Sequence, residues 1–172
     1  MISKYKFSII IPTFKRRKKL RRAIDSVIAQ TIDNWEIIVI DNNSNDGTKE
    51  LIKSYKNKKI KFYLINNEGN IAKSRNLGIL KSNGNYLAFL DSDDSWLPKK
   101  LEECLKILNG KTKLVYHELY LQKKMNQLFF KKNGLCRTLN KPVFNDLIYN
   151  GPAFPTSSVI VEKKIFQKIN FF

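Results

Sequence analysis

The sequence predicts an α/β fold in which helices flank a mostly parallel β-sheet. Short apolar runs of strand length alternate along the chain with longer stretches whose apolar residues recur at helical spacing. Strands that are separated by helices of this length are typical of βαβ units with right-handed crossovers. The chain has 172 residues, of which 42% are hydrophobic, so it can bury a core of its own and we expect a single domain.

Six apolar runs are expected to form strands. The first four end directly before a Pro, Asp or Asn, as strands do where a turn follows. All six are rich in the β-branched, aromatic and aliphatic residues that buried strands favour. They are Phe7–Ile11, Trp35–Ile40, Ile60–Ile65, Tyr86–Leu90, Leu114–Leu121 and Thr156–Val161.

The stretches between the strands are expected to be helical. After the first strand, Leu20, Ala23, Ile24, Val27 and Ile28 recur on one face of a helix. The other expected helices are one that carries Leu51, Ile52 and Tyr55, and the segments Ile71–Lys81, Lys99–Leu108, Phe144–Tyr149 and Lys163–Ile169.

Turn chemistry refines some of these elements. Asp46 or Thr48 can cap the second helix, and Gly84 can close the third helix in a left-handed conformation. Gly78 lies inside the third helix, where glycine costs about 1 kcal/mol relative to alanine, and a close backbone approach would justify it. The pattern weakens over 123–141, which we expect to form an excursion or a hairpin.

The chain is strongly basic. It has 32 Lys and Arg residues against 15 Asp and Glu residues, a formal net charge of +17, and this balance favours anionic partners such as nucleotides, nucleic acid or acidic lipid headgroups. The densest basic segment is Lys15–Arg22. Such a cluster could hold the protein at the surface of an anionic membrane, since each charge there is worth about 1 kcal/mol. The alternative is a lysine-rich composition spread over solvated helix faces.

Two negative observations bear on location. The sequence has no run of about eighteen apolar residues, so no membrane span is predicted, and the first apolar run is too short for a secretory signal. Cys104 and Cys136 are far apart and form no metal-binding or redox pair, which is typical of reduced thiols. We therefore expect a cytoplasmic protein. The basic segment would also allow peripheral contact with the inner face of the membrane.

The most informative motif is Asp91-Ser92-Asp93-Asp94, which directly follows the strand Tyr86–Leu90. Open α/β sheets bind ligands at the carboxyl ends of their strands. Closely spaced carboxylates are hard oxygen donors that suit Mg²⁺ or Mn²⁺, and such a cation suits a diphosphate. The alternative is an ordinary acidic turn, because Asp and Ser also form Asx-turns.

Other polar residues are expected at the same edge of the sheet. Pro12 and Thr13 follow the first strand, and the fixed φ of a proline suits a chain that makes room for a flat base. Asp41 ends the second strand and can accept hydrogen bonds from a uracil imide or a ribose hydroxyl. Period-2 alternation would place Asp91 and Asp93 on one side, one facing the ribose and the other a metal. Arg75 could offset phosphate charge, or it could be a solvated surface arginine.

These segments together resemble the nucleotide-sugar-binding half of the family 2 inverting glycosyltransferases, which have the GT-A fold. The resemblance covers nearly the whole chain and rests on several ordered motifs. They are Ser8-Ile9-Ile10-Ile11-Pro12-Thr13-Phe14, Gln30-Thr31, Trp35–Asp41, Asn43-Ser44-Asn45-Asp46-Gly47-Thr48, Asn67-Glu68-Gly69-Asn70, Arg75-Asn76-Leu77-Gly78, the acidic motif with Trp96–Leu101, and Ser157–Val161 with Phe166.

The resemblance implies a GT-A type fold, with a Rossmann-like, mostly parallel sheet flanked by helices. Residues 1–121 would form the nucleotide-sugar-binding half, and 122–172 would begin the acceptor-side half of the same domain. It also implies a reaction in which an acceptor hydroxyl attacks the anomeric carbon of a sugar nucleotide with inversion, while a metal-bound diphosphate leaves. The donor would be a UDP-sugar, the cation Mn²⁺ or Mg²⁺, and the acceptor a glycan or a lipid-linked sugar.

The resemblance also implies roles for single residues. Pro12, Thr13 and Asp41 would bind the base and ribose, and Arg75 would lie near the uracil or the phosphates. Asp91, Ser92 and Asp93 would form the DxD-type element that binds the nucleotide sugar. The residues implied as metal ligands are Asp93 and Asp94.

No residue is assigned as the general base. The family carries that carboxylate beyond the Ser157–Val161 strand, after a Gly-Gly-Phe turn, where this chain has Ile169-Asn170-Phe171-Phe172. We therefore expect a chain that is truncated before the base segment, binds the donor and transfers sugar poorly or not at all. His117, the only histidine, is expected to be structural.

A different class of function also fits the charge. The chain could be a non-catalytic module that binds nucleotides or polyanions. Nucleic acid is not expected as a partner, because the sequence contains no recognised nucleic-acid-binding motif and aromatic residues in strands are usually core.

Overall fold

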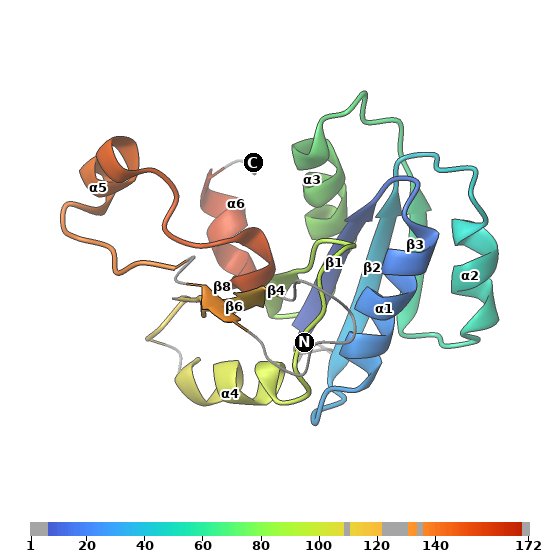
Figure 1. Ribbon diagram of the computed structural model, residues 1–172, viewed down its shortest axis with the longest axis horizontal. Helices are drawn as coiled ribbons and strands as arrows, with labels where there is room; N and C mark the ends of the chain where they lie inside the picture. Colours follow the sequence, from blue (N-terminus) through green and yellow to red (C-terminus); the bar gives the residue numbers. More distant parts are fainter. Residues whose placement is uncertain (1–6, 109–110, 122–130, 134–135, 170–172) are drawn as a thin grey trace.

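The computed structural model describes residues 7–108, 111–121, 131–133 and 136–169. Six strands form the main sheet in the order β3-β2-β1-β4-β8-β5 (Figure 1). The first four of these strands along the chain are mutually parallel, and β8 runs antiparallel to both of its neighbours. The predicted α/β fold with a mostly parallel sheet is thus confirmed.

The parallel strands lie close to their predicted positions. They are β1 (Phe7–Thr13), β2 (Trp35–Asp41), β3 (Ile60–Leu64) and β4 (Tyr86–Phe89). Every residue of β1 and β2 is buried. Strands at the centre of a parallel sheet are covered on both faces, which is why their sequences read as continuous apolar runs.

Helices cover both faces of the sheet. On one face, α1 (Arg17–Ile28), α2 (Thr48–Ser54) and α4 (Lys100–Ile107) share a core with Ile9 and Ile11. On the other face, α3 (Ile71–Lys81) and α6 (Phe166–Ile169) share a second core with Ile10, Leu87 and Phe89. The alternation of side chains along β1 therefore separates the two cores. Within the described residues, no helix is long and apolar enough to cross a membrane.

The remaining elements follow β4. They are β5 (Leu114–Val115), β6 (Leu119–Leu121), β7 (Lys131–Asn133), α5 (Val143–Asn150) and β8 (Ile160–Glu162), with short 3-10 turns at Thr156–Ser158 and Lys163–Ile165. Strands β6 and β7 pair as a separate antiparallel ladder. The excursion or hairpin expected over 123–141 includes β7, which pairs with β6; residues 122–130 and 134–135 lie outside the described residues.

Two predicted strands are shorter than expected. The run Leu114–Leu121 divides into β5 and β6, which belong to different sheets, because Tyr116 between them stacks on Phe154 with ring centroids 4.4 Å apart. The run Thr156–Val161 begins as a 3-10 turn, in which the Ser158 hydroxyl donates to the Pro155 carbonyl over 2.7 Å. Serine hydroxyls that bond locally to the backbone compete with strand pairing.

The predicted role of Gly84 as a left-handed cap is wrong. Helix α3 ends at Lys81 with Ser82 in an extended conformation, and Gly84 is not among the residues with positive φ. A Cβ atom at Gly84 would lie 2.6 Å from the Ser8 hydroxyl and 2.7 Å from the Ser8 backbone nitrogen. Glycine is required there because the chain passes directly against β1.

At the second helix, the predicted cap at Asp46 or Thr48 is wrong, because the residue between them is the N-cap. Gly47 occupies the N-cap position, and the Asp46 carboxylate accepts from the Thr48 backbone N–H over 3.1 Å and from its hydroxyl over 2.6 Å.

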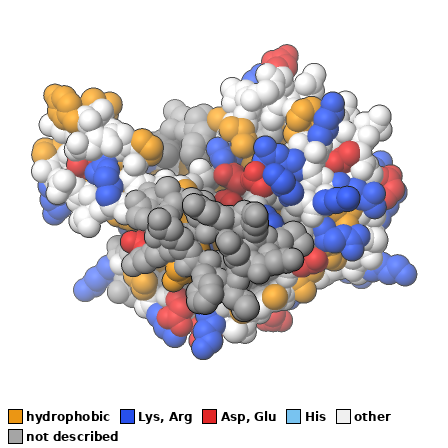
Figure 2. Space-filling view, in the orientation of Figure 1, with side chains coloured by type: hydrophobic (Ala, Val, Ile, Leu, Met, Phe, Trp, Pro, Cys, Tyr) orange, Lys and Arg blue, Asp and Glu red, His pale blue; other side chains and the backbone are white. Residues whose placement is uncertain are grey.

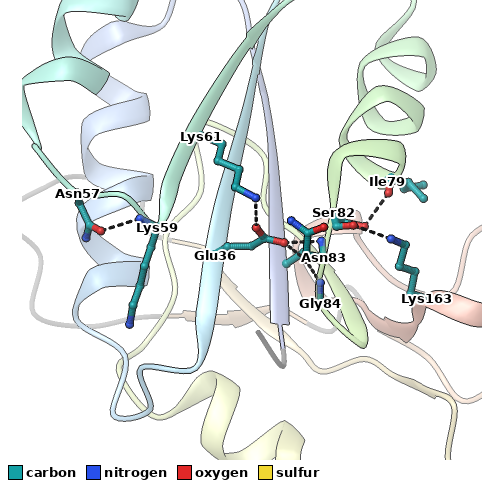
Figure 3. Close-up of polar contacts among 10 residues, drawn as sticks. Glu36, Asn57, Lys59, Lys61, Ile79, Ser82, Asn83, Gly84 and Lys163 are labelled. Atoms are coloured by element: carbon teal, nitrogen blue, oxygen red, sulfur yellow. Dashed lines mark hydrogen bonds and ion pairs between the residues drawn. The ribbon is translucent and has the colours of Figure 1, made fainter. Parts of the chain in front are cut away.

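A buried carboxylate lies at the amino ends of the central strands (Figure 3). Glu36 on β2 is fully buried, and it accepts hydrogen bonds from the Ser8 hydroxyl (2.7 Å), the Asn83 backbone N–H (2.5 Å) and the Lys61 ammonium (2.7 Å). The Ser8 hydroxyl in turn accepts from the Gly84 N–H over 2.7 Å. This single side chain joins β1, β2, β3 and the turn before β4.

The environment of Glu36 favours its charged form. Burial raises its pKa, but the hydrogen bonds from Lys61, Ser8 and the Asn83 backbone outweigh burial and hold the pKa below its ordinary value of 4.5. A carboxylate whose pKa is lower in the folded state stabilises the fold above its unfolded pKa. That stability is lost as the pH falls through the folded-state pKa.

We therefore expect Glu36→Gln to lower the free energy of unfolding by about 1–3 kcal/mol at neutral pH, because charged hydrogen bonds are replaced by neutral ones. As the pH falls below 4.5, the free energy of unfolding should decrease less in the variant than in the wild type, because glutamine does not titrate. Urea denaturation at several pH values measures both effects. The exposed Glu50→Gln is the matched control, and equal pH profiles for wild type and Glu36→Gln would contradict the assignment.

The close approach expected at Gly78 is present. A Cβ atom at this position would lie 2.4 Å from Cγ2 and 3.1 Å from Cγ1 of the buried Ile10. Gly78→Ala should therefore destabilise the fold by about 1–3 kcal/mol through overpacking, although alanine is the better helix former. The double variant Gly78→Ala/Ile10→Ala should be more stable than the sum of the single changes implies. Additive effects in thermal unfolding would exclude this contact as the cause.

Candidate functional site

A cavity of about 300 Å³ opens at the carboxyl ends of the parallel strands. It lies where the strand order reverses: the chain runs outward from β1 to β2 and β3, and then returns to place β4 on the other side of β1. Such a reversal point leaves a crevice between neighbouring strand ends, where α/β sheets bind ligands. The residues that line it are Pro12, Thr13, Phe14, Arg16, Asn42, Asn67, Gly69, Ile71, Ser74, Asp91, Ser92 and Asp93.

The sequence-predicted site residues separate into two groups. Pro12, Thr13, Asp91, Ser92 and Asp93 line the cavity, so residues from two distant segments meet there as expected. The other three candidates are not among the lining residues. Arg75 bonds to the lining residue Asp91, whereas Asp41 bonds to Ser44 and Asp94 to Ser157.

The acidic motif forms a turn and not a strand. Strand β4 ends at Phe89, and the Asp94 N–H donates to the Asp91 carbonyl over 2.9 Å. The expectation that strand alternation places Asp91 and Asp93 on one side is therefore wrong, because these residues lie in a turn and not in a strand. The two carboxylates bind different cations: Asp91 Oδ1 lies 2.9 Å from Arg75 Nη2, and Asp93 Oδ2 lies 2.7 Å from Arg16 Nη1.

Asp94 is partly buried beside the two other carboxylates of the motif. Burial raises its pKa, a hydrogen bond from Ser157 opposes that rise, and the charges of Asp91 and Asp93 raise it further. Three acidic groups packed this closely repel one another, and a cation bound beside them would relieve the repulsion.

A segment distant in sequence supports the acidic turn. The buried Ser157 hydroxyl accepts from the Asp91 N–H over 3.0 Å, and the Ser157 carbonyl accepts from the Trp96 indole N–H over 2.9 Å. Both ends of the turn are thus attached to the 3-10 turn that precedes β8. The position of the acidic residues depends on this part of the chain.

Asp41 is buried and faces its own loop. Its carboxylate accepts hydrogen bonds from the backbone N–H and the hydroxyl of Ser44. Burial raises the pKa of Asp41, the two bonds from Ser44 oppose that rise, and the charge of Asp46 adds to it. Asp41 thereby shapes the loop after β2, and it is the next residue, Asn42, that reaches the cavity wall.

Several lining residues were not singled out from the sequence. The Asn42 side chain accepts from the Asn67 N–H over 2.8 Å, and the Asn67 amide donates to the Ser74 hydroxyl over 2.8 Å. These bonds join the loops after β2 and β3 to α3. The Asn67–Asn70 motif was a usable signal, because Asn67 also accepts from the Gly69 N–H and Asn70 caps α3.

One polar group in the cavity wall lacks a partner. The Thr13 hydroxyl oxygen is buried and has no hydrogen-bond partner among the described residues, although Thr13 lines the cavity. A buried hydroxyl without a partner costs free energy. A ligand that hydrogen-bonds to the Thr13 hydroxyl would recover this free energy.

His117 lies outside this site, between β5 and β6, and its Nδ1 donates to the Glu118 carbonyl over 2.8 Å. Burial, with a smaller contribution from the charge of Lys100, lowers the pKa of His117 to about 4. The imidazole is therefore neutral at pH 7.

The carboxylates at the cavity could supply some of the oxygen ligands of a magnesium or manganese ion, but not all of them. Among the described residues, no group of three or more His, Cys, Asp or Glu side chains is arranged to hold a metal ion. Mg²⁺ keeps several waters and binds through one or two carboxylates plus substrate phosphates. The two carboxylates at the cavity wall, Asp91 and Asp93, meet that requirement only when a phosphate ligand completes the site.

Comparison with known proteins identifies relatives of this chain. An uncharacterized glycosyltransferase of Rickettsia typhi is 34% identical over 176 residues, which span 96% of this chain and 52% of the relative. In Escherichia coli, the UDP-Glc:alpha-D-GlcNAc-diphosphoundecaprenol beta-1,3-glucosyltransferase WfgD is 36% identical over 98 residues, 57% of this chain and 39% of that protein. The chain thus spans about half or less of the length of these relatives.

Solved structures show the same fold. TarS of Staphylococcus aureus, residues 1–349, superposes with a TM-score of 0.76 at 22% identity, over 97% of this chain and 50% of that one. TarS has also been solved with UDP and with UDP-GlcNAc. The likeness confirms the predicted GT-A type fold. The family model described as glycosyl transferase family 2 matches residues 8–169, and this chain therefore belongs to glycosyltransferase family 2.

Proposed function

We propose that this chain binds a nucleotide sugar, with UDP as the nucleotide, for transfer of the sugar to the hydroxyl of a glycan or lipid-linked acceptor. The observation that carries the proposal is the cavity at the strand-order reversal, which has an unpartnered threonine hydroxyl and two carboxylates in its wall. Two comparisons support the identity of the donor and acceptor. TarS has been solved with UDP-GlcNAc, and the name of WfgD specifies UDP-Glc and a diphosphoundecaprenol-linked sugar.

The cavity wall suggests how the nucleotide would lie. Pro12 and Thr13 would contact the base and ribose, with the Thr13 hydroxyl supplying a hydrogen bond, and Asp41 would hold the adjoining loop in place. Asp91 and Asp93 would face the diphosphate. Arg75 would act by neutralising Asp91, to which it is bonded, since its side chain is only 14% exposed.

A divalent cation, Mn²⁺ or Mg²⁺, completes the proposed site. Asp93 would bind it, with Asp94 beside it, and the cation would supply charge that stabilises the diphosphate as a leaving group. Charge at the cavity supports this requirement. The described lining residues carry two carboxylates and one guanidinium, so an added diphosphate needs further positive charge.

The proposed reaction inverts the anomeric carbon. The acceptor oxygen would bond to that carbon on the face opposite the diphosphate, as the bond to the diphosphate oxygen breaks. The proton of the acceptor hydroxyl would pass to a general base, a role that is assigned to none of the described residues. The residues at the cavity wall contribute by fixing the donor and by stabilising the charge that develops on the departing UDP.

The first test measures the metal dependence of nucleotide binding. Isothermal titration should show that UDP binds the wild type more tightly with Mn²⁺ than without it, and that Asp93→Asn loses this gain, by about tenfold or more. The control is Asp33→Asn, which removes a carboxylate whose side chain is 95% exposed and which precedes β2 at the opposite end of the sheet. UDP binding that is independent of Mn²⁺ in the wild type would refute the cation site.

The second test separates binding from stability. Thr13→Val should change the free energy of unfolding by less than about 1 kcal/mol, because the hydroxyl has no partner in the described structure, yet it should weaken UDP binding about fivefold through a lost hydrogen bond. Thr48→Val is the matched control, for which we expect a change in stability and none in UDP affinity. It loses the 2.6 Å bond to Asp46, so stability should fall while UDP affinity stays unchanged. Unaltered UDP affinity in Thr13→Val would remove Thr13 from the site.

A further inference from the structure

Positive charge is scarce inside the cavity of this basic protein. Figure 2 shows Lys and Arg side chains gathered over the part of the surface where α1 and α2 lie. Of the described residues that line the cavity, however, Arg16 is the one with a cationic side chain. It shares the wall with Asp91 and Asp93. A diphosphate entering this cavity therefore meets one guanidinium and two carboxylates.

Arg16 is held at the acidic turn by Asp93. Its Nη1 lies 2.7 Å from Asp93 Oδ2, and Lys19 Nζ lies 4.0 Å from the same oxygen. The side chains of Arg16 and Asp93 are 49% and 37% exposed. An exposed ion pair of this kind is worth about 0–1 kcal/mol. Exchanging the partner of Arg16 therefore costs little.

The turn itself does not depend on that ion pair. Arg22, on α1, donates from Nη2 to the backbone carbonyl of Asp93. This bond leaves the carboxylate of Asp93 free to change its partner. The Asp91 N–H bond to Ser157 fixes the other end of the turn. The backbone at both ends of the acidic turn therefore has hydrogen-bond partners other than Arg16.

We propose that Arg16 binds the diphosphate of the donor, and that in the ligand-free protein it occupies Asp93 in place of the divalent cation. The inference rests on the proposed function. When the cation binds Asp93, it displaces the guanidinium, which then lies beside the incoming phosphates in the same cavity. Arg16 is suited to this role because its planar fork pairs with either a carboxylate or a phosphate.

The exchange couples the two ligands. Without nucleotide, Arg16 competes with the cation for Asp93, so its removal should strengthen binding of Mn²⁺ alone. With nucleotide and cation both present, Arg16 contributes to binding, so its removal should weaken UDP. A residue that merely stabilises the acidic turn would not move these two affinities in opposite directions.

The test compares Arg16→Gln with Arg21→Gln. Arg21 lies on α1, of which Arg16 is the N-cap residue, and it carries the same charge. Both arginines line the basic surface beside Asp46, but of the two only Arg16 lines the cavity. Isothermal titration would use three probes: Mn²⁺ alone, uridine, and UDP with saturating Mn²⁺. For Arg16→Gln we expect Mn²⁺ alone to bind severalfold more tightly, uridine unchanged, and UDP about tenfold more weakly. Arg21→Gln should match the wild type with all three probes.

The outcomes are distinguishable. UDP affinity in Arg16→Gln equal to that of the wild type overturns the proposed phosphate contact. Unchanged or weaker binding of Mn²⁺ alone overturns the exchange at Asp93. Failure of the wild type to bind UDP under any condition overturns the proposed function itself. Circular dichroism would establish that each variant is folded, and Arg16→Lys, which keeps the charge without the fork, should recover part of the UDP affinity.

Discussion

The arrangement of the sheet depends on one buried carboxylate. Glu36 satisfies donors from β1, from β3 and from the turn before β4, so it fixes the register of strands that are far apart in sequence. A slip of one residue in β2 would turn its side chains to the opposite face and leave this charge without its partners. The cavity forms between the carboxyl ends of strands that are in register. The contacts of Glu36 at the amino ends of the same strands therefore help to position the cavity.

Electrostatics at the two edges follow different rules. At the amino ends, a buried carboxylate is fully hydrogen-bonded, and such groups are rigid because every alternative leaves a charge unpaired. At the carboxyl ends, the Arg16–Asp93 ion pair is exposed on both sides, at 49% and 37%, and an exposed pair of this kind contributes little to stability. The Lys61–Glu36 pair, whose carboxylate is buried, therefore contributes to the fold, whereas the exposed Arg16–Asp93 pair contributes little to it.

The sequence was most informative where local pattern determines structure. Strands β1 to β4 and helix α3 lie close to their predicted ranges, because continuous apolar runs and helical periodicity report burial directly. The interrupted run before β6 and the 3-10 turn before β8 were missed because they depend on contacts such as the Tyr116–Phe154 stack. Gly84 was misread for a related reason: a glycine that admits a neighbouring strand has the same sequence signature as a glycine that ends a helix.

The site shows the same division. Pro12, Thr13 and the acidic motif were predicted at the cavity because strand ends can be read from the sequence. Asn42, Asn67 and Arg16 were not, since each reaches the cavity through a loop conformation that is set by hydrogen bonds between distant segments. A ligand contact of Asp41 and Arg75 stays a prediction, because the carboxylate of Asp41 and the guanidinium of Arg75 both bond to neighbouring protein groups.

The 3-10 turn at Thr156–Ser158 has a consequence for how this protein can be divided. The chain contributes β5 and then β8 to the main sheet, and the 3-10 turn directly before β8 bonds through Ser157 to Asp91 and to Trp96. A chimaera should therefore take the 3-10 turn and β8 from the same parent protein as the acidic turn. A boundary between them would remove the hydrogen bonds of Ser157 that hold the acidic turn.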